Sequence, residues 1–166
     1  MGKSSLINML TGNVSLAKTS STPGKTTLIN HFLVNSAWYL VDLPGYGYAK
    51  RGKAQVEEIR HAIQGYVLRR RQLTCLFLLI DARHEPQRID LEFIRFLGEN
   101  GVPFAIVFTK ADKLSRSRLN TGVEAFLARL EEEWEALPPH FVTSSVNKTG
   151  KEDLLEYIRT INEGLK

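Results

Sequence analysis

The chain has 166 residues, a net charge of +4 and 43% hydrophobic residues. This length predicts one domain, and the apolar content is too high for a disordered chain. The longest apolar run, Cys75 to Ile80, is far shorter than the ~20 residues that span a bilayer. Because no signal segment precedes it, we expect a cytoplasmic protein without a membrane anchor. The single cysteine excludes an internal disulfide, and the histidines show no spacing typical of a zinc site.

Positive charge is concentrated in one stretch of the sequence. Residues 50–71 hold seven Lys and Arg side chains against Glu57 and Glu58, whereas residues 131–135 are mostly acidic. A basic face can follow the phosphates of a nucleic acid. A solvated helix face is the commoner origin of such a stretch, and the sequence leaves both interpretations open.

Strands and helices alternate along most of the chain. The expected elements are a helix at 4–11, a long loop at 13–26, strands at 28–34 and 38–43, a Gly-rich loop at 44–48, a helix at 54–71, a strand at 73–81, a helix at 88–99, a strand at 102–109, a helix at 118–137, a short strand starting at 141–143 and a helix at 151–163. This order predicts an α/β protein whose mostly parallel sheet is covered by helices on both faces. Loops at the carboxyl ends of its strands are then the expected place for a functional site.

The first helix begins with Gly2-Lys3-Ser4, which matches the last three positions of the phosphate-binding loop Gly-x-x-x-x-Gly-Lys-Ser/Thr. In such a loop, N–H groups at the helix terminus bind phosphate oxygens, the Lys neutralises the outer phosphates and the hydroxyl holds Mg²⁺. The tripeptide alone occurs often by chance, and an ordinary helix start explains it more simply.

Asp42-Leu43-Pro44-Gly45 directly follows the second expected strand. In the functional interpretation, Asp42 lies on the Mg²⁺ side and acts through a water molecule, while the N–H of Gly45 reaches a terminal phosphate. A plain Pro-Gly turn after a strand is the alternative.

Thr109-Lys110-Ala111-Asp112 follows the strand at 102–109 and carries a more specific chemistry. The Asp112 carboxylate can accept hydrogen bonds from both the ring N–H and the exocyclic amine of guanine, a donor pair that adenine lacks. The alternative is that Asp112 is the N-cap of the next helix. Thr143-Ser144-Ser145 ends the last strand, where backbone N–H groups can meet the guanine carbonyl.

These four elements occur in the order of a small guanine-nucleotide domain, which favours a GTP-binding protein. Residues 19–26, 41–50 and 109–113 resemble the EngB family (also written YihA or YsxC) of ribosome-assembly GTPases, a group of the translation-factor-like GTPases. The stretch Asp-Leu-Pro-Gly-Tyr-Gly-Tyr-Ala at 42–49 is especially typical of that family. The resemblance implies a P-loop NTPase three-layer sandwich, a single G domain over residues 1–166, with a mostly parallel sheet and one antiparallel edge strand.

The resemblance also implies ligands, partners and site residues. Nucleotide contacts are assigned to Gly2, Lys3, Ser4 and Ser5, to Gly24, Lys25, Thr26, Thr27 and Leu28, to Asp42, Leu43, Pro44 and Gly45, and to Thr109, Lys110, Ala111, Asp112, Thr143, Ser144 and Ser145. Ser4 and Thr26 would ligate Mg²⁺, and GTP or GDP would be the bound nucleotide. The implied role is assembly of the large ribosomal subunit, with ribosomal RNA as a partner and a link to cell division and septation. We expect a monomer.

Two features depart from the family pattern. Family members carry a strand and the Gly-rich half of the phosphate loop before the position of Gly2. We therefore expect that the first central strand is missing, either because the chain is a fragment or because its start is assigned at an internal codon. Unpaired backbone groups on the neighbouring strands would cost on the order of 1–3 kcal/mol each. Tyr46 also stands where Ras-type enzymes have a glutamine that orients the attacking water, so we expect slow hydrolysis that needs a monovalent cation or the ribosome. The sequence identifies no catalytic base.

The leading hypothesis is a Mg²⁺-dependent GTPase switch whose loops at 13–28 and 43–54 change order with the γ-phosphate. Two alternatives remain: a nucleotide-free fragment that binds RNA or the ribosome, and an ATP-using P-loop kinase. Asp112 and the lack of a substrate lid disfavour the kinase.

Overall fold

The structure, a computed structural model, describes residues 2–12, 29–45 and 52–165. The chain forms two compact units, one made of Met1–Ala17 with Thr74–Lys166 and the other of Lys18–Leu73. Among the described residues, no helix combines the length and the apolar character needed to cross a bilayer.

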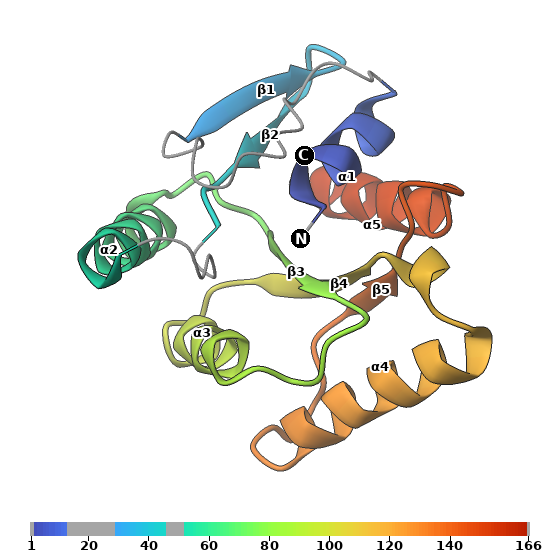
Figure 1. Ribbon diagram of the computed structural model, residues 1–166. Helices are drawn as coiled ribbons and strands as arrows, with labels where there is room; N and C mark the ends of the chain where they lie inside the picture. The colour runs from blue at the N-terminus through green and yellow to red at the C-terminus, as the bar shows by residue number, and fades with distance from the viewer. Residues whose placement is uncertain (1, 13–28, 46–51, 166) are drawn as a thin grey trace. The chain divides into compact units, whose positions relative to one another are not determined.

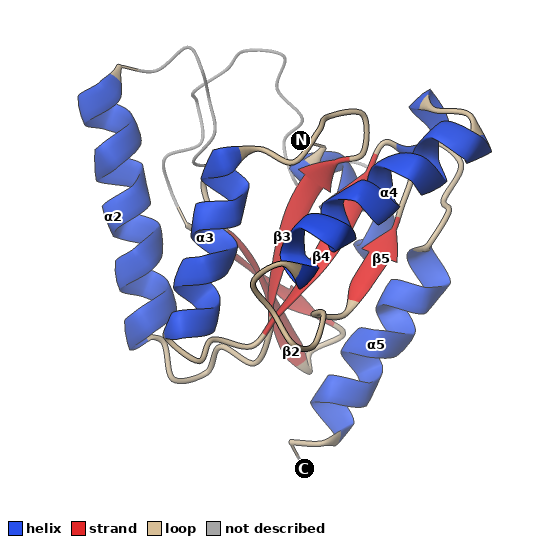
Figure 2. Ribbon diagram, turned by 90° about the horizontal axis from the view of Figure 1, so that it is seen from below, coloured by secondary structure: helices blue, strands red, loops and turns tan. Residues whose placement is uncertain are grey.

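The first unit is a three-layer α/β structure (Figures 1 and 2). A parallel sheet in the order β3-β4-β5 lies between α1 and α5 on one face and α3 and α4 on the other. Its elements are α1 (Lys3–Thr11), β3 (Leu76–Asp81), α3 (Arg88–Glu99), β4 (Phe104–Thr109), a 3₁₀ turn (Ala111–Lys113), α4 (Arg116–Glu131), β5 (His140–Val142) and α5 (Lys151–Glu163).

The core of this unit is built around β4, which is buried along its whole length. β4 pairs in parallel with β3, with Thr109 opposite Asp81, and with β5, with Phe108 opposite Val142. The Phe108 ring packs edge-on against Phe126 of α4, with ring centroids 5.5 Å apart. Continuous burial of a central parallel strand is what an uninterrupted apolar run predicts.

The second unit contains a hairpin and one long helix (Figure 1). β1 (Asn30–Val34) and β2 (Trp38–Asp42) pair antiparallel, and α2 (Lys53–Arg69) follows. Asn35 and Ser36 turn the chain with positive φ angles of 51° and 53°, in the left-handed region that Asn adopts more readily than most residues. The hairpin and its turn are as predicted. One stripe of α2 is buried, made of Ile59, Ile63 and Val67.

Most expected elements are confirmed with small shifts at their ends. The helices expected at 88–99 and 151–163 have these bounds in the structure. The strand expected at 73–81 begins later, at Leu76, because its partner β4 begins only after Pro103, whose carbonyl accepts the Leu76 N–H. The loop expected at 13–26 lies outside the described residues.

The helix expected at 118–137 needs a correction, because α4 begins at Arg116 and ends at Glu131. Trp134 packs edge-on against Phe104, with ring centroids 5.9 Å apart, and lies so close to Gly98 that a Cβ there would overlap its ring. These tertiary contacts with α3 and β4 compete with continued helix, and they draw the chain away from the helical path.

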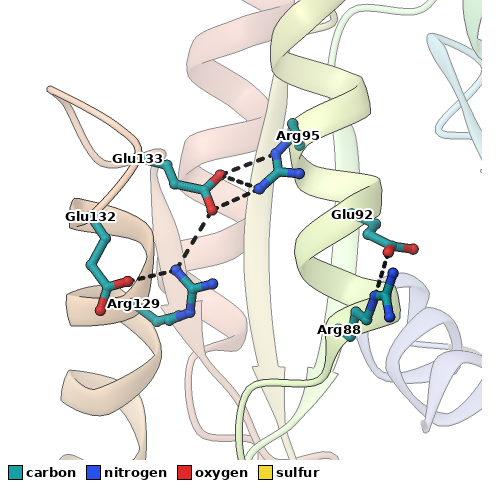
Figure 3. A network of polar contacts seen from close by, with 6 residues as sticks. All are labelled: Arg88, Glu92, Arg95, Arg129, Glu132 and Glu133. Atoms are coloured by element: carbon teal, nitrogen blue, oxygen red, sulfur yellow. Dashed lines mark hydrogen bonds and ion pairs between the residues drawn. The ribbon is translucent and has the colours of Figure 1, made fainter.

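A polar network accompanies this exit (Figure 3). Glu133 accepts hydrogen bonds from Nε and Nη2 of Arg95 on α3, at 3.1 and 2.7 Å, and lies 3.6 Å from Nη1 of Arg129. Exposed pairs of this kind contribute little to stability. The network therefore marks where the chain leaves α4 more than it stabilises the fold.

The N-cap of α4 provides a test of local stability. The Ser115 hydroxyl oxygen accepts a hydrogen bond from the N–H of Arg118 at 3.3 Å. We expect Ser115→Ala to lower the free energy of unfolding by about 1 kcal/mol, because this N–H loses its acceptor. Urea unfolding measures the change, and Ser117→Ala, an exposed position in the same turn, is the control. Equal midpoints for the two variants would contradict a capping role.

Candidate functional site

The carboxyl ends of β3, β4 and β5 lie at one edge of the parallel sheet in the first unit. Asp81 ends β3 opposite Thr109, which ends β4, and Thr143 directly follows β5. Thr109 is buried, and its hydroxyl donates to the Ile80 carbonyl at 3.4 Å. Ligands of open α/β sheets bind at this edge, so the residues that follow these strands form the candidate site.

Asp112 is positioned by the loop that follows β5. Its Oδ1 accepts a hydrogen bond from the Ser144 hydroxyl at 2.7 Å, and the Ala111 N–H donates to the Thr143 carbonyl at 3.1 Å. The Asp112 side chain is still 15% exposed and so can reach a ligand. The Ser144 hydrogen bond lowers the pKa of Asp112 against the opposing effect of desolvation, which keeps the carboxylate ionised at neutral pH.

The alternative role of Asp112 as a helix N-cap is wrong. Asp112 lies within the short 3₁₀ turn Ala111–Lys113, and the residue that caps α4 is Ser115. The Asp112 side chain is therefore not engaged by the helix that follows it.

The Lys110 loop lies beside the amino-terminal end of α1. Lys110 has a left-handed backbone, with φ 61°, and a Cβ added at Gly2 would lie 3.8 Å from Lys110 Cε. Gly2 also has a positive φ of 75°, and its carbonyl accepts the Leu6 N–H. The structure thus brings Gly2, Lys3 and Ser4 to the same place as the loop that carries Asp112.

Thr143 and Ser144 are buried, with 1% and 0% of their surface exposed. The Thr143 N–H donates to the Phe108 carbonyl at 2.7 Å, and the Ser144 N–H donates to the Thr149 carbonyl at 3.1 Å. These N–H groups are already satisfied inside the fold. In the described part of the chain the Ser145 N–H has no such bond, so the predicted contact with a base carbonyl falls to Ser145.

Asp81 was not among the predicted site residues, yet it joins two cations at this edge. Its carboxylate accepts hydrogen bonds from Nε and Nη2 of Arg83, at 3.0 and 2.7 Å, and Oδ2 lies 3.4 Å from Nζ of Lys110. Burial raises the pKa of Asp81, but the Arg83 hydrogen bonds and the Lys110 charge outweigh it and hold the pKa well below its usual range. The sequence held a signal for this contact: Asp81 ends the apolar strand expected at 73–81, and Lys110 directly follows the strand expected at 102–109.

Loss of the Asp81 charge should destabilise the protein in a pH-dependent way. We expect Asp81→Asn to cost about 1–2 kcal/mol at pH 7, because Arg83 and Lys110 lose their negative partner. A carboxylate with a depressed folded-state pKa contributes its full stability above the unfolded pKa of about 4, and this contribution is lost progressively as the pH falls from that value through the lower folded-state pKa. Urea unfolding at neutral pH and near pH 3 should therefore show the gap between wild type and variant narrowing in acid. If wild type and Asp81→Asn differ by the same free energy of unfolding at both pH values, the depressed pKa of Asp81 is contradicted. The control is Glu85→Gln, which removes a negative charge from an exposed position.

The remaining predicted residues lie in the second unit or outside the described chain. Asp42 is 5% exposed at the end of β2, and residues 43–45 follow it. Residues 24–28, which include the expected Mg²⁺ ligand Thr26, lie outside the described residues, as does Tyr46. Their assigned roles stay predictions.

Comparison with known proteins identifies relatives over the whole chain. Residues 1–110 match the family described as 50S ribosome-binding GTPase. The chain is 63% identical over its full length to the probable GTP-binding protein EngB of Phocaeicola vulgatus, of which it covers 83%. It is 64% identical, over 99% of its length, to the protein of the same name in Porphyromonas gingivalis, of which it covers 82%.

Solved structures support the fold. A crystal structure of a probable GTP-binding protein engB matches with a TM-score of 0.72 and 23% identity, covering 98% of this chain and 94% of that one. Apo translation elongation factor SelB of Methanococcus maripaludis matches with a TM-score of 0.68 and 19% identity, covering 98% of this chain and 32% of that one.

The fold and these similarities together define a P-loop GTPase, a class of GTP-binding proteins. Within that class, the chain belongs to the EngB family. The predicted fold class, with a parallel sheet and an antiparallel pair of strands, is therefore confirmed, and so is the predicted family. The ATP-using kinase alternative is excluded.

Proposed function

We propose that this chain is a GTP-dependent switch that acts in assembly of the large ribosomal subunit, with a link to cell division and septation. The observation that carries the proposal is the Asp112 carboxylate, held by Ser144 close to Lys110 and the amino-terminal end of α1. A carboxylate for the base next to a helix terminus for the phosphates fits a guanine nucleotide. The family's description as ribosome-binding supports the ribosomal role. We expect a cytoplasmic monomer.

Base recognition follows from the acceptors of Asp112. The Ser144 hydroxyl occupies one acceptor position of Oδ1, and an ionised carboxylate has further lone pairs for the ring N–H and the amine of guanine. The apolar stem of Lys110 can lie along the base, and the Ser145 N–H can donate to its carbonyl. Adenine has no such pair of donors, so the Asp112 carboxylate would be left without hydrogen-bond partners on the base. The site therefore selects guanine over adenine.

Phosphate binding is assigned to the start of α1. The first N–H groups of a helix have no intrahelical acceptors, and the helix dipole favours anions there. Lys3 would neutralise the outer phosphates. The Ser4 hydroxyl lies one residue further into α1 and is the kind of oxygen ligand that Mg²⁺ prefers, so the residues present fit this ion. When bound, Mg²⁺ supplies charge neutralisation at the β- and γ-phosphates. Contributions of Thr26 and Asp42 stay predictions.

Slow hydrolysis is the expected consequence of tyrosine at position 46. A tyrosine side chain lacks the amide that orients the attacking water in Ras-type enzymes. We therefore propose that hydrolysis depends on an activator, either a monovalent cation such as K⁺ or the ribosomal subunit itself.

Calorimetric titration with GDP and Mg²⁺, using ADP as the control ligand, tests the nucleotide assignment. We expect GDP to bind and ADP not to bind. GTP turnover measured with K⁺ or Na⁺, and with or without large ribosomal subunits, tests the activator. Equal binding of ADP would contradict the base site. Failure of GDP to bind while RNA binds would favour the nucleotide-free alternative.

A further inference from the structure

The positive charge of the chain comes from its second unit. Residues 18–73 carry nine Lys and Arg against three Asp and Glu, whereas the rest of the chain carries 13 against 15. The nucleotide-binding residues assigned to the first unit do not account for this surplus. The part of this unit that the structure describes holds five of these cations, Lys53, Arg60, Arg69, Arg70 and Arg71, against Asp42, Glu57 and Glu58. Three of the five are consecutive, and such a local cluster of positive charge attracts a polyanion.

A row of aromatic side chains crosses from α2 to the hairpin of this unit. The Arg70 guanidinium carbon lies 5.9 Å from the centroid of the Tyr66 ring, and the Tyr66 and His31 rings are 6.3 Å apart. The His31 ring meets Tyr39 edge-on at 6.4 Å. The row thus begins with a cation and ends with Tyr39, which is 62% exposed.

Three arginines stand at the carboxyl end of α2, and all are exposed. In the part of this unit that the structure describes, the ion pairs join Glu57 to Arg60 and His61, and none involves residues 69–71. Arg69 closes the helix, where the dipole favours a cation. Arg70 is the C-cap residue, and Arg71 follows it outside the helix, so a single helix end carries three adjacent cations. Five arginines of the first unit pair with carboxylates, namely Arg83, Arg88, Arg95, Arg129 and Arg159.

Exposed apolar side chains lie in the same unit. Leu33 is 56% exposed and is the cross-strand partner of Tyr39, and Leu68, on α2, is 51% exposed. Arginines alone would suit any anionic surface. An exposed ring with an apolar neighbour, however, offers a stacking platform that neither a phospholipid headgroup nor an acidic peptide needs.

We infer that the surface formed by Arg69, Arg70, Arg71, Tyr66, His31 and Tyr39 binds single-stranded RNA. Phosphates contact the arginines, and a base stacks on the exposed Tyr39 ring. Because every base has a π face, the surface binds with little sequence preference and with strong salt dependence. The choice of RNA as the polyanion rests on the proposed ribosomal function, while the charge and the aromatic row come from the structure.

The arginines are tested with a matched pair of double variants. Fluorescence anisotropy of a short labelled oligouridylate is measured with the full chain over a series of KCl concentrations. Arg70→Ala/Arg71→Ala should weaken binding and reduce the slope of log K against log salt by about 1.4, at roughly 0.7 for each lost phosphate contact. Arg116→Ala/Arg118→Ala removes the same charge from exposed positions on α4 and should leave the slope unchanged.

The ring is tested by substitutions that separate aromatic from apolar character. Tyr39→Leu should weaken RNA binding by roughly 5- to 150-fold, because the stacking platform is lost. Tyr39→Phe keeps the ring and should retain wild-type affinity. An equal loss in both variants would contradict stacking.

Three outcomes overturn the inference. They are equal salt slopes in the two double variants, full RNA affinity in Tyr39→Leu, and binding to phosphatidylglycerol vesicles without binding to RNA. GDP titration of the same preparations keeps the two proposals distinguishable. If the protein binds GDP but the substitutions leave RNA binding unchanged, this surface is refuted and the nucleotide switch is not. If the protein does not bind GDP but the substitutions weaken RNA binding as expected, the nucleotide switch is refuted and the surface is supported.

Discussion

Asp112→Asn is expected to reduce GDP affinity by about 10³- to 10⁵-fold, the largest effect of any single substitution at the nucleotide site. The asparagine amide keeps one acceptor oxygen but turns an NH₂ group toward a base donor. One hydrogen bond to a charged partner is lost, and two donors then face each other without an acceptor. Calorimetric titration of the variant with GDP in Mg²⁺ measures the loss.

The same substitution should create a new preference. Xanthine has a carbonyl where guanine has its exocyclic amine, so the asparagine oxygen can accept from the ring N–H while its NH₂ donates to that carbonyl. We therefore expect Asp112→Asn to bind xanthosine diphosphate more tightly than GDP. Asp153→Asn, which removes an exposed charge from the first turn of α5, is the control and should behave as wild type. Unchanged GDP affinity in Asp112→Asn would place the base elsewhere.

Local patterns were sufficient to predict most of the fold, and tertiary contacts account for the exceptions. The continuous apolar runs identified β3 and β4, and α3 and α5 were predicted with their observed ends. The end of α4 was missed because it depends on the packing of Trp134 against Phe104 and Gly98, residues that lie far from it in the sequence. No helical periodicity contains that information.

The candidate site was predictable in its parts but not in its connections. The composition of the loop predicted that Lys110 and Asp112 bind the nucleotide, and the fold class implied that this loop lies close to Gly2. The hydrogen bond from Ser144 to Asp112 and the ion pair from Lys110 to Asp81 cross between strands. Such contacts depend on register, which the sequence of a single strand does not specify.

Gly150→Ala is expected to lower the free energy of unfolding by about 2–5 kcal/mol, a large part of the ~5–15 kcal/mol that stabilises a domain. Two costs combine at this residue, which precedes α5. The backbone has φ 77°, where a side chain costs roughly 1–2 kcal/mol. A Cβ would also overlap the Val142 carbonyl oxygen and lie 3.0 Å from Thr143 Cγ2, and such overpacking costs about 1–3 kcal/mol.

A matched glycine separates these two costs. Gly101 has a similar φ of 65°, but no heavy atom of the described structure lies within 4 Å of the Cβ that alanine would add. Gly101→Ala should therefore show only the backbone cost, and the two variants should differ by about 1–3 kcal/mol in urea unfolding. Because Gly150 closes the loop that holds Ser144 against Asp112, Gly150→Ala should also weaken GDP binding at temperatures where it remains folded. Equal destabilisation by the two alanines would show that the loop moves away from the Val142 carbonyl at little cost.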